Sequence, residues 1–142
     1  MSNRERGAVF QRYAADALAK ATGLAFDLEV PLTIGEPPKS HSFDLATRDR
    51  AYVGESKAFA WTVSGLPPSA KISTLREAAQ YLRSLSPQTT TFIVMARSVH
   101  PLNGEPLADY FSRLNDHLLG KVAVIEVCDA TGTVRFVRGR LP

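Results

Sequence analysis

The stretch FDLATRDRAYVGESKAF, residues 43–59, places two carboxylates and a lysine where a folded domain would usually place apolar side chains. Residues 41–47 and 51–59 combine β-branched, aromatic and alternating polar positions, which is typical of strands. The segment TRDR between them is polar and short, as in a turn. We therefore expect an antiparallel hairpin whose second strand carries the acid and the lysine.

The position of the turn decides which side chains of this hairpin face each other. With the turn centred between Asp49 and Arg50, the numbers of facing residues sum to 99, so Asp44 lies opposite Glu55. Directly opposed side chains project from the same face of a sheet. Lys57 shares the face of Glu55, because side chains alternate along a strand with a period of two. The sequence therefore predicts that the three charged groups converge on one patch.

Two opposed carboxylates repel each other, and a divalent cation would turn that repulsion into attraction. Carboxylate oxygens suit Mg²⁺, and a lysine beside the ion can hold or activate a water molecule. A metal, a water and a cation together are suited to attack on a phosphodiester. The alternative is that Asp44, Glu55 and Lys57 form the solvated face of an edge hairpin, with a Glu–Lys pair that contributes little.

The remaining chain predicts an α/β (α+β) domain with a mixed central sheet flanked by helices. Helical and strand-like segments follow one another in the order helix, three strands, helix, strand, helix and two strands. A capping-box pattern at Ser2 and Glu5 predicts a helix from about Asn3, with a stop at Gly23. The further segments are a strand over 24–34 that Pro31 breaks, a helix over 73–85, a buried strand over 89–97, a helix over 105–119, and a closing hairpin over 121–127 and 133–139.

Composition places the chain among single-domain globular proteins. Its 142 residues, 44% hydrophobic and 22% charged, suit one domain spanning residues 1–142, and the net charge of +3 permits a polyanionic partner without requiring one. The single cysteine, Cys128, excludes an internal disulfide and is expected in the core. No apolar run is long enough for a membrane span and the N-terminus lacks the apolar segment of a signal peptide, so we expect a cytoplasmic protein without membrane contact.

These residues resemble the PD-(D/E)XK nuclease superfamily, which has the restriction-endonuclease-like fold. The matching motifs are Asp44 in SFDLA and Glu55 and Lys57 in VGESKAF, and the likeness extends from the first helix to about residue 97. The resemblance implies an αβββαβ core, with the C-terminal helix and hairpin added to it. It also implies that Asp44, Glu55 and the backbone carbonyl of Ser56 hold Mg²⁺ or Mn²⁺, while Lys57 acts on the attacking water. The expected substrate is DNA, with RNA as an open alternative.

The chain departs from the family pattern in ways that keep a second interpretation open. Gln11 in GAVFQ stands where members commonly carry an acid on the first helix, and Ser42-Phe43 replaces the nominal proline before the first aspartate. Gln80 in AAQYL matches half of a motif of RecB-like members, whose second residue would here be Ser84. Gln11 and Gln80 are candidate accessory residues. The alternative function is a catalytically inactive domain that binds nucleic acid or a protein.

Several residues outside the motif are candidates for contact with substrate. Trp61 and Lys71, with Arg76 on the predicted second helix, could contact nucleic acid, the alternatives being core packing for the tryptophan and an ordinary solvated face for the cations. His41 is close to Asp44 and could touch substrate, or be a loop histidine without a role. A homodimer would supply two hydrolytic centres for two DNA strands. Its interface is expected at the helix over 105–119, through Tyr110, Phe111 and Leu114, and at the closing hairpin, unless the helix merely covers the sheet.

Overall fold

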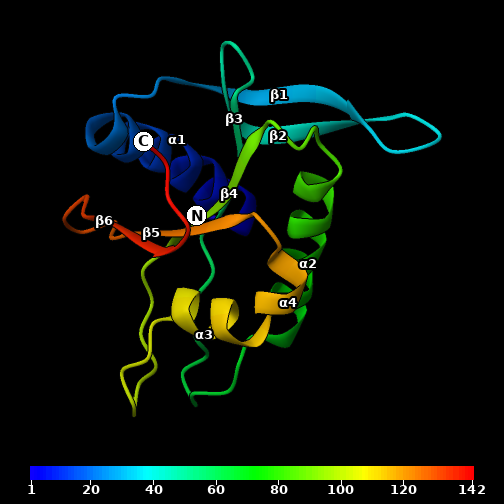
Figure 1. The fold of residues 1–142 in the computed structure, drawn as a ribbon. Helices are drawn as coiled ribbons and strands as arrows, with labels where there is room; N and C mark the ends of the chain where they lie inside the picture. The colour runs from blue at the N-terminus through cyan, green and yellow to red at the C-terminus, as the bar shows by residue number, and fades with distance from the viewer.

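The computed structural model describes all 142 residues and contains one six-stranded mixed sheet with helices on both faces (Figure 1). The strands lie side by side in chain order, β1 to β6. The pairs β3–β4 and β4–β5 are parallel, and the other three pairs are antiparallel. The elements are α1 (Asn3–Thr22), β1 (Phe26–Ile34), β2 (Lys39–Thr47), β3 (Tyr52–Lys57), α2 (Ser69–Arg83), β4 (Thr90–Ala96), α3 (Leu107–Leu114), α4 (Asp116–Leu119), β5 (Ala123–Val127) and β6 (Val134–Arg138).

The sheet divides the buried side chains into two clusters, and helices cover each of them. Helix α1 covers one face with Phe10, Ala14 and Leu18, while α2, α3 and α4 cover the other (Figure 1). Connections between parallel strands need a crossover, and α2 makes it between β3 and β4. The predicted α+β class with a mixed sheet between helices is confirmed.

The first helix begins and ends where its caps predict. The Ser2 hydroxyl accepts the backbone N–H of Glu5 at 3.1 Å and donates to the Glu5 carboxylate, also at 3.1 Å. Gly23 ends the helix in the left-handed conformation, with φ 78°. Val9 of this helix does not join the buried face, because it is 57% exposed.

The β2–β3 hairpin has the predicted register. Leu45 pairs with Gly54, so the numbers of facing residues sum to 99. The turn is held by the Asp49 carboxylate, which accepts the Thr47 hydroxyl at 2.8 Å and the Ala51 N–H at 3.0 Å. Short polar side chains that bond to nearby backbone favour such turns, which is why TRDR reverses the chain here.

Gly54, in the middle of the motif strand, is required by close packing. A Cβ atom added to it would lie 2.3 Å from the ring of Phe92, which is fully buried on β4. The neighbouring strand therefore places its aromatic ring directly against the Gly54 backbone. A larger residue at position 54 would therefore clash with this ring.

Other parts of the chain differ from the sequence-based expectation. Pro31 does not end its strand, because β1 is a sheet edge and one side of it needs no N–H donor. Helix α2 begins at Ser69, four residues before the expected start. The predicted helix over 105–119 is two helices, since the buried Asn115 interrupts it and its side chain donates to the Phe111 carbonyl at 3.0 Å.

The C-terminal elements also correct two expectations. Cys128 lies just beyond β5 and is only half-buried, so it is not a core residue. On α3, Phe111 is fully buried, whereas Leu114 is 44% exposed. The apolar face of α3 therefore covers the sheet and is not free to form the expected dimer interface. None of the helices has both the length and the apolar character needed to cross a bilayer.

Candidate active site

Asp44 lies at the point where the hydrogen-bond ladder between β2 and β3 ends. Its carboxylate oxygen Oδ2 accepts the backbone N–H of Ser56 at 2.8 Å and lies 3.4 Å from the Ser56 hydroxyl. The side chain thus takes over the role that a β2 carbonyl would have in a continuous ladder. This bond fixes the Asp44 carboxylate against the end of the motif strand.

Glu55 is buried behind Asp44, with 4% of its surface exposed. Burial and, next in size, the adjacent Asp44 carboxyl together raise the pKa of its carboxyl to about 9, against the opposing positive charge of Lys57. At neutral pH, Glu55 is therefore protonated while it lies beside a second carboxyl. Two carboxyls in such a position hold a proton between them unless a cation replaces it.

His41 is the neighbour of Glu55 on the other side. Its Nε2 is 2.8 Å from Glu55 Oε1, and its ring stacks on Tyr81 of α2 at 4.0 Å between ring centres. Burial lowers the pKa of His41, although the Asp44 carboxylate acts in the opposite direction. The contact with Glu55 is therefore a hydrogen bond between neutral groups and not an ion pair. His41 belongs to β2, so the interpretation as a loop histidine is wrong.

A recess of about 370 Å³ opens in front of these groups, between the start of α1, the end of β3 and the start of α2. Asp44, Ser56 and Lys57 are in its wall, and Glu55 lies behind them. The structure thus brings Asp44, Glu55 and Lys57 together at the carboxyl end of β3, with Lys57 and the Asp44 carboxylate accessible from the recess. The other lining residues are Asn3, Arg4, Arg6, Gly7, Ala8, Gln11, Glu29, Ala58, Phe59 and Lys71.

Gln11 reaches this recess from α1, where it is one of the few buried polar residues. Its Nε2 donates to the Glu29 carboxylate at 3.3 Å. Glu29 lies on β1 opposite Asp44, at the position where the β1–β2 pairing is interrupted. Its φ of 55° is unusual for a residue other than glycine. The recess therefore contains an acid that sequence reasoning missed, because only the β1–β2 register brings it next to Asp44.

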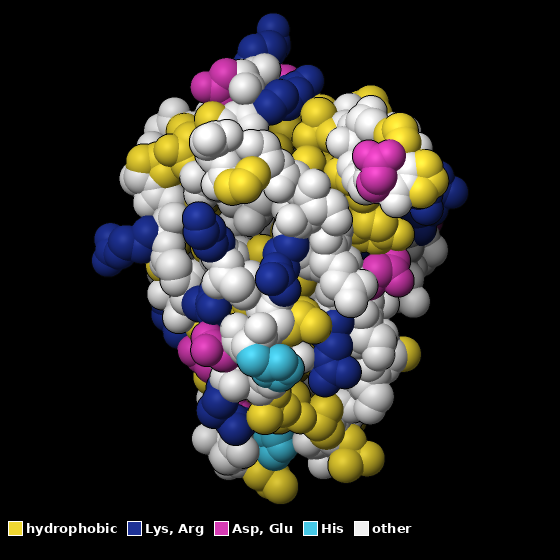
Figure 2. Space-filling view, turned by 45° about the vertical axis from the view of Figure 1, so that its right-hand side comes forward, with side chains coloured by type: hydrophobic (Ala, Val, Ile, Leu, Met, Phe, Trp, Pro, Cys, Tyr) yellow, Lys and Arg dark blue, Asp and Glu magenta, His cyan; other side chains and the backbone are white.

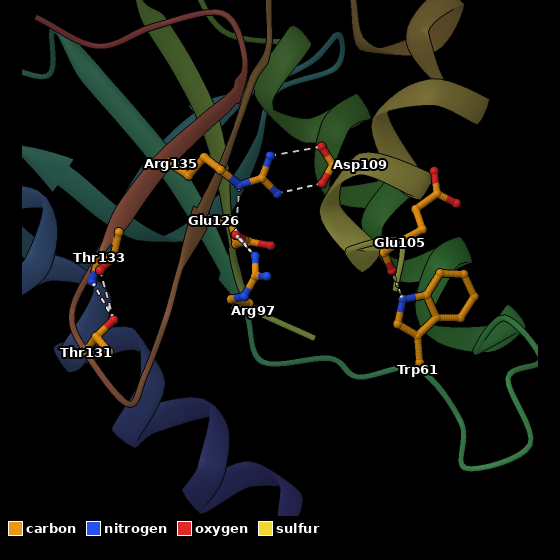
Figure 3. A network of polar contacts seen from close by, with 8 residues as sticks. All are labelled: Trp61, Arg97, Glu105, Asp109, Glu126, Thr131, Thr133 and Arg135. Carbon is orange, nitrogen blue, oxygen red and sulfur yellow. Dashed lines mark hydrogen bonds and ion pairs between the residues drawn. The ribbon is translucent and has the colours of Figure 1, made fainter. Parts of the chain in front are cut away.

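Gln80 and Trp61 are not brought to the recess. Gln80 is exposed on α2, and its carbonyl accepts the Ser84 hydroxyl at 3.0 Å. The Trp61 indole donates to the Glu105 carbonyl at 2.9 Å (Figure 3). Its ring packs edge-on against Tyr110. Trp61 therefore has a packing role, which was the alternative to nucleic-acid contact. It ties the loop after β3 to the loop before α3.

The two cations expected to contact nucleic acid have different surroundings. Lys71 lies at the start of α2 and lines the recess. Arg76 instead donates from Nε to the Asn115 side chain at 2.8 Å and stabilises the junction of α3 and α4. Figure 2 shows Lys and Arg side chains scattered over the face that includes α2, without one continuous basic patch. Of these two cations, Lys71 is thus the one that lies at the recess.

A second cluster of charges lies two strands away at the same end of the sheet, at the ends of β4 and β5. Glu126 is 3% exposed and accepts hydrogen bonds from Arg97 at 2.9 Å and Arg135 at 3.0 Å, and Arg135 also pairs with Asp109 of α3 (Figure 3). The Asp109 carboxylate, and to a lesser extent that of Glu126, raises the pKa of Arg135. The cluster anchors α3 to the closing hairpin and is separate from the recess.

The donor set at the recess fits a hard divalent cation. The N–H of Ser56 points toward Asp44, and the carbonyl of a strand residue points to the same side as its N–H, so the Ser56 carbonyl lies on the side of Asp44. No group of three or more His, Cys, Asp or Glu side chains in the chain is arranged to hold a metal ion. Mg²⁺ and Mn²⁺ do not need such a group, because one or two carboxylates, a carbonyl and water suffice.

Comparison with known proteins adds no assignment to this geometry. No protein-family model matches the chain. No curated protein and no solved structure matches it either. The function is therefore inferred from the residues of the recess alone.

Proposed function

We propose that the chain is a Mg²⁺- or Mn²⁺-dependent nuclease of the PD-(D/E)XK, restriction-endonuclease-like kind, which hydrolyses phosphodiester bonds of DNA. The observation that carries the proposal is the pair of adjacent carboxyls, Asp44 and the buried Glu55, beside Lys57 at the end of β3. A sheet gains no stability from two carboxyls in contact. Their placement, with Asp44 in the wall of a polar recess and Glu55 behind it, is explained if a cation completes the site.

The proposed roles follow from what each group faces. Asp44, Glu55 and the Ser56 carbonyl would hold the ion, which supplies positive charge to the phosphoryl oxygens and lowers the pKa of a bound water. Lys57, accessible in the recess, would orient the attacking water or neutralise charge on the phosphate. Hydrolysis adds the water oxygen to phosphorus and breaks one phosphorus–oxygen ester bond, leaving a phosphate monoester and a hydroxyl group.

The Glu55–His41 contact supports the carboxyl from behind. His41 is itself held by stacking on Tyr81, so the Glu55 carboxyl has a fixed orientation toward Asp44. Preorganised groups need little rearrangement when the ion and substrate enter. We infer that His41 positions Glu55 and does not contact the reacting phosphate.

Incubation of the purified chain with labelled DNA and RNA tests the proposal. Cleavage should require Mg²⁺ or Mn²⁺, cease with a chelator, and be lost in Asp44→Asn without loss of folding. Asp49→Asn is the matched control, because it removes a carboxylate from the turn of the same hairpin. Cleavage that survives both the chelator and Asp44→Asn would contradict the mechanism.

The second candidate is a nuclease-fold domain that binds nucleic acid or a protein without cutting. Gln11 favours it, because an amide stands at the helix position where family members commonly carry an acid. Calorimetric titration separates the two candidates. Mn²⁺ binding that Asp44→Asn abolishes, together with cleavage, supports the enzyme, whereas nucleic-acid binding without metal binding or cleavage supports the inactive domain.

A homodimer remains part of the proposal, since two centres related by a two-fold axis would cut both strands of a duplex. With the α3 face covered, the closing hairpin is the remaining candidate interface, and β6 is an exposed edge of the sheet. Unpaired strand edges readily pair with another chain. Light scattering at micromolar concentration tests this, and a monomeric mass with only single-strand nicking would contradict it.

A further inference from the structure

Two adjoining hollows form one groove along α1, and together they extend well beyond the proposed metal site. They share Arg6, Ala58 and Phe59. The first is the polar recess of about 370 Å³ that contains Asp44. The second, about 440 Å³, is lined mainly by hydrophobic side chains. The groove therefore has a polar half and an apolar half that meet at Phe59.

The polar half contains four cations and two carboxylates, Glu29 and Asp44. None of the four cations forms an ion pair within 4.0 Å, whereas six arginines elsewhere in the chain do. Unpaired positive charge at the wall of a recess attracts anions, and a phosphate chain is the anion that spans several cations. The cations are Arg4, Arg6, Lys57 and Lys71.

The apolar half exposes side chains that a folded protein normally buries. Val9 is 57% exposed and Met1 is 74% exposed, and both line this hollow with Phe10 and Tyr13. The Phe59 ring lies between the two halves, with the Lys71 ammonium 5.6 Å from its centre. An aromatic ring beside cations is the arrangement on which nucleic-acid bases stack.

We propose that this groove binds a single strand of nucleic acid, with phosphates along the cations of the polar half and bases against Phe59 and the apolar half. The proposal rests on the proposed function, because the same polar half contains Asp44 and Lys57. A duplex keeps its base faces inside the helix and would leave the apolar half uncovered. An unpaired strand presents both phosphates and base faces, so it matches both halves at once.

Fluorescence anisotropy with a labelled oligothymidylate, in chelator so that no cleavage occurs, tests the proposal. The wild-type chain should bind the single strand more tightly than a duplex of the same length. Arg4→Ala/Arg6→Ala should weaken binding about tenfold or more and reduce the slope of log K against log salt by roughly 1.4, since each lost phosphate contact contributes about 0.7. Phe59→Leu should weaken binding about fivefold to a hundredfold without changing that slope.

Helix α1 offers a matched control, Arg12→Ala/Lys20→Ala, which removes the same charge from exposed positions outside the groove. Its affinity and salt slope should stay close to those of the wild type. Arg4 and Arg6 lie in the first turn, where positive charge opposes the helix dipole, so their replacement should not lower the melting temperature.

Three results would overturn the proposal: equal losses in the two double variants, equal or tighter binding of the duplex, or no effect of Phe59→Leu. The nuclease proposal is tested separately by metal-dependent cleavage. Binding localised to the groove without cleavage would support the groove and contradict the nuclease. Cleavage that is unchanged in Arg4→Ala/Arg6→Ala and in Phe59→Leu would support the nuclease and contradict the groove.

Discussion

Replacement of Glu55 by glutamine should remove most of the pH dependence of stability above neutral pH. In the folded chain burial and the adjacent Asp44 carboxyl raise the pKa of Glu55 from 4.5 to about 9. Between these values the folded state holds a proton that the unfolded state releases, so the free energy of unfolding falls as pH rises. The stabilising effect of this proton is complete below the unfolded pKa and is lost as pH rises through the folded pKa.

The magnitude follows from one proton and the width of the pH window. One proton changes the free energy of unfolding by about 1.4 kcal/mol per pH unit, so the wild type should lose about 2 kcal/mol between about pH 7 and about pH 8.5. Burial lowers the pKa of His41, which makes stability rise with pH as its unfolded form titrates near 6.5. A window that begins at pH 7 keeps most of this opposite effect out of the measurement.

Urea denaturation in chelator at several pH values within this window measures the effect. The Glu55→Gln variant should show a nearly flat dependence, because an amide has no proton to release. Glu36→Gln is the matched control, since it removes one carboxylate from the exposed β1–β2 turn and should keep the wild-type slope. A wild-type slope equal to that of Glu55→Gln would refute the reasoning, because it would mean that the Glu55 carboxyl is already ionised in the folded chain.

Three further predictions concern the hairpin and the first helix. Asp44→Asn should fold and lose Mn²⁺ binding measured by calorimetry, because one of the two carboxyls proposed to hold the ion is gone; tight Mn²⁺ binding in this variant would contradict the proposed site. Gly54→Ala should destabilise the chain by about 1–3 kcal/mol in urea, because the new Cβ would overlap the ring of Phe92, and an unchanged midpoint would show that β3 and β4 separate easily. Ser2→Ala should lower the free energy of unfolding by about 1 kcal/mol through loss of the N-cap, whereas Ser2→Asp should retain most of it.

The local features of the chain could be predicted from sequence because each depends on a few neighbouring residues. The capping pair Ser2 and Glu5 begins α1, Gly23 ends it, and the TRDR turn determines the register that brings Asp44 opposite Glu55. Alternation along β3 then places Glu55 and Lys57 on the same face. The early start of α2 at Ser69 and the break at Asn115 were missed because long-range packing and hydrogen bonds decide them.

The surroundings of the site were decided by tertiary structure alone. Residues as distant as Arg6, Glu29 and Lys71 share one recess only because α1, β1 and α2 meet at the end of β3, and no local pattern encodes that meeting. The protonation of Glu55 has the same origin, since an isolated strand would leave its carboxyl in water with an ordinary pKa. The sequence by itself thus determined which charged residues face one another across the hairpin, because register and alternation are local properties. Burial and the convergence of distant elements determined what those charges can do, because both depend on the whole sheet and its helices being in place.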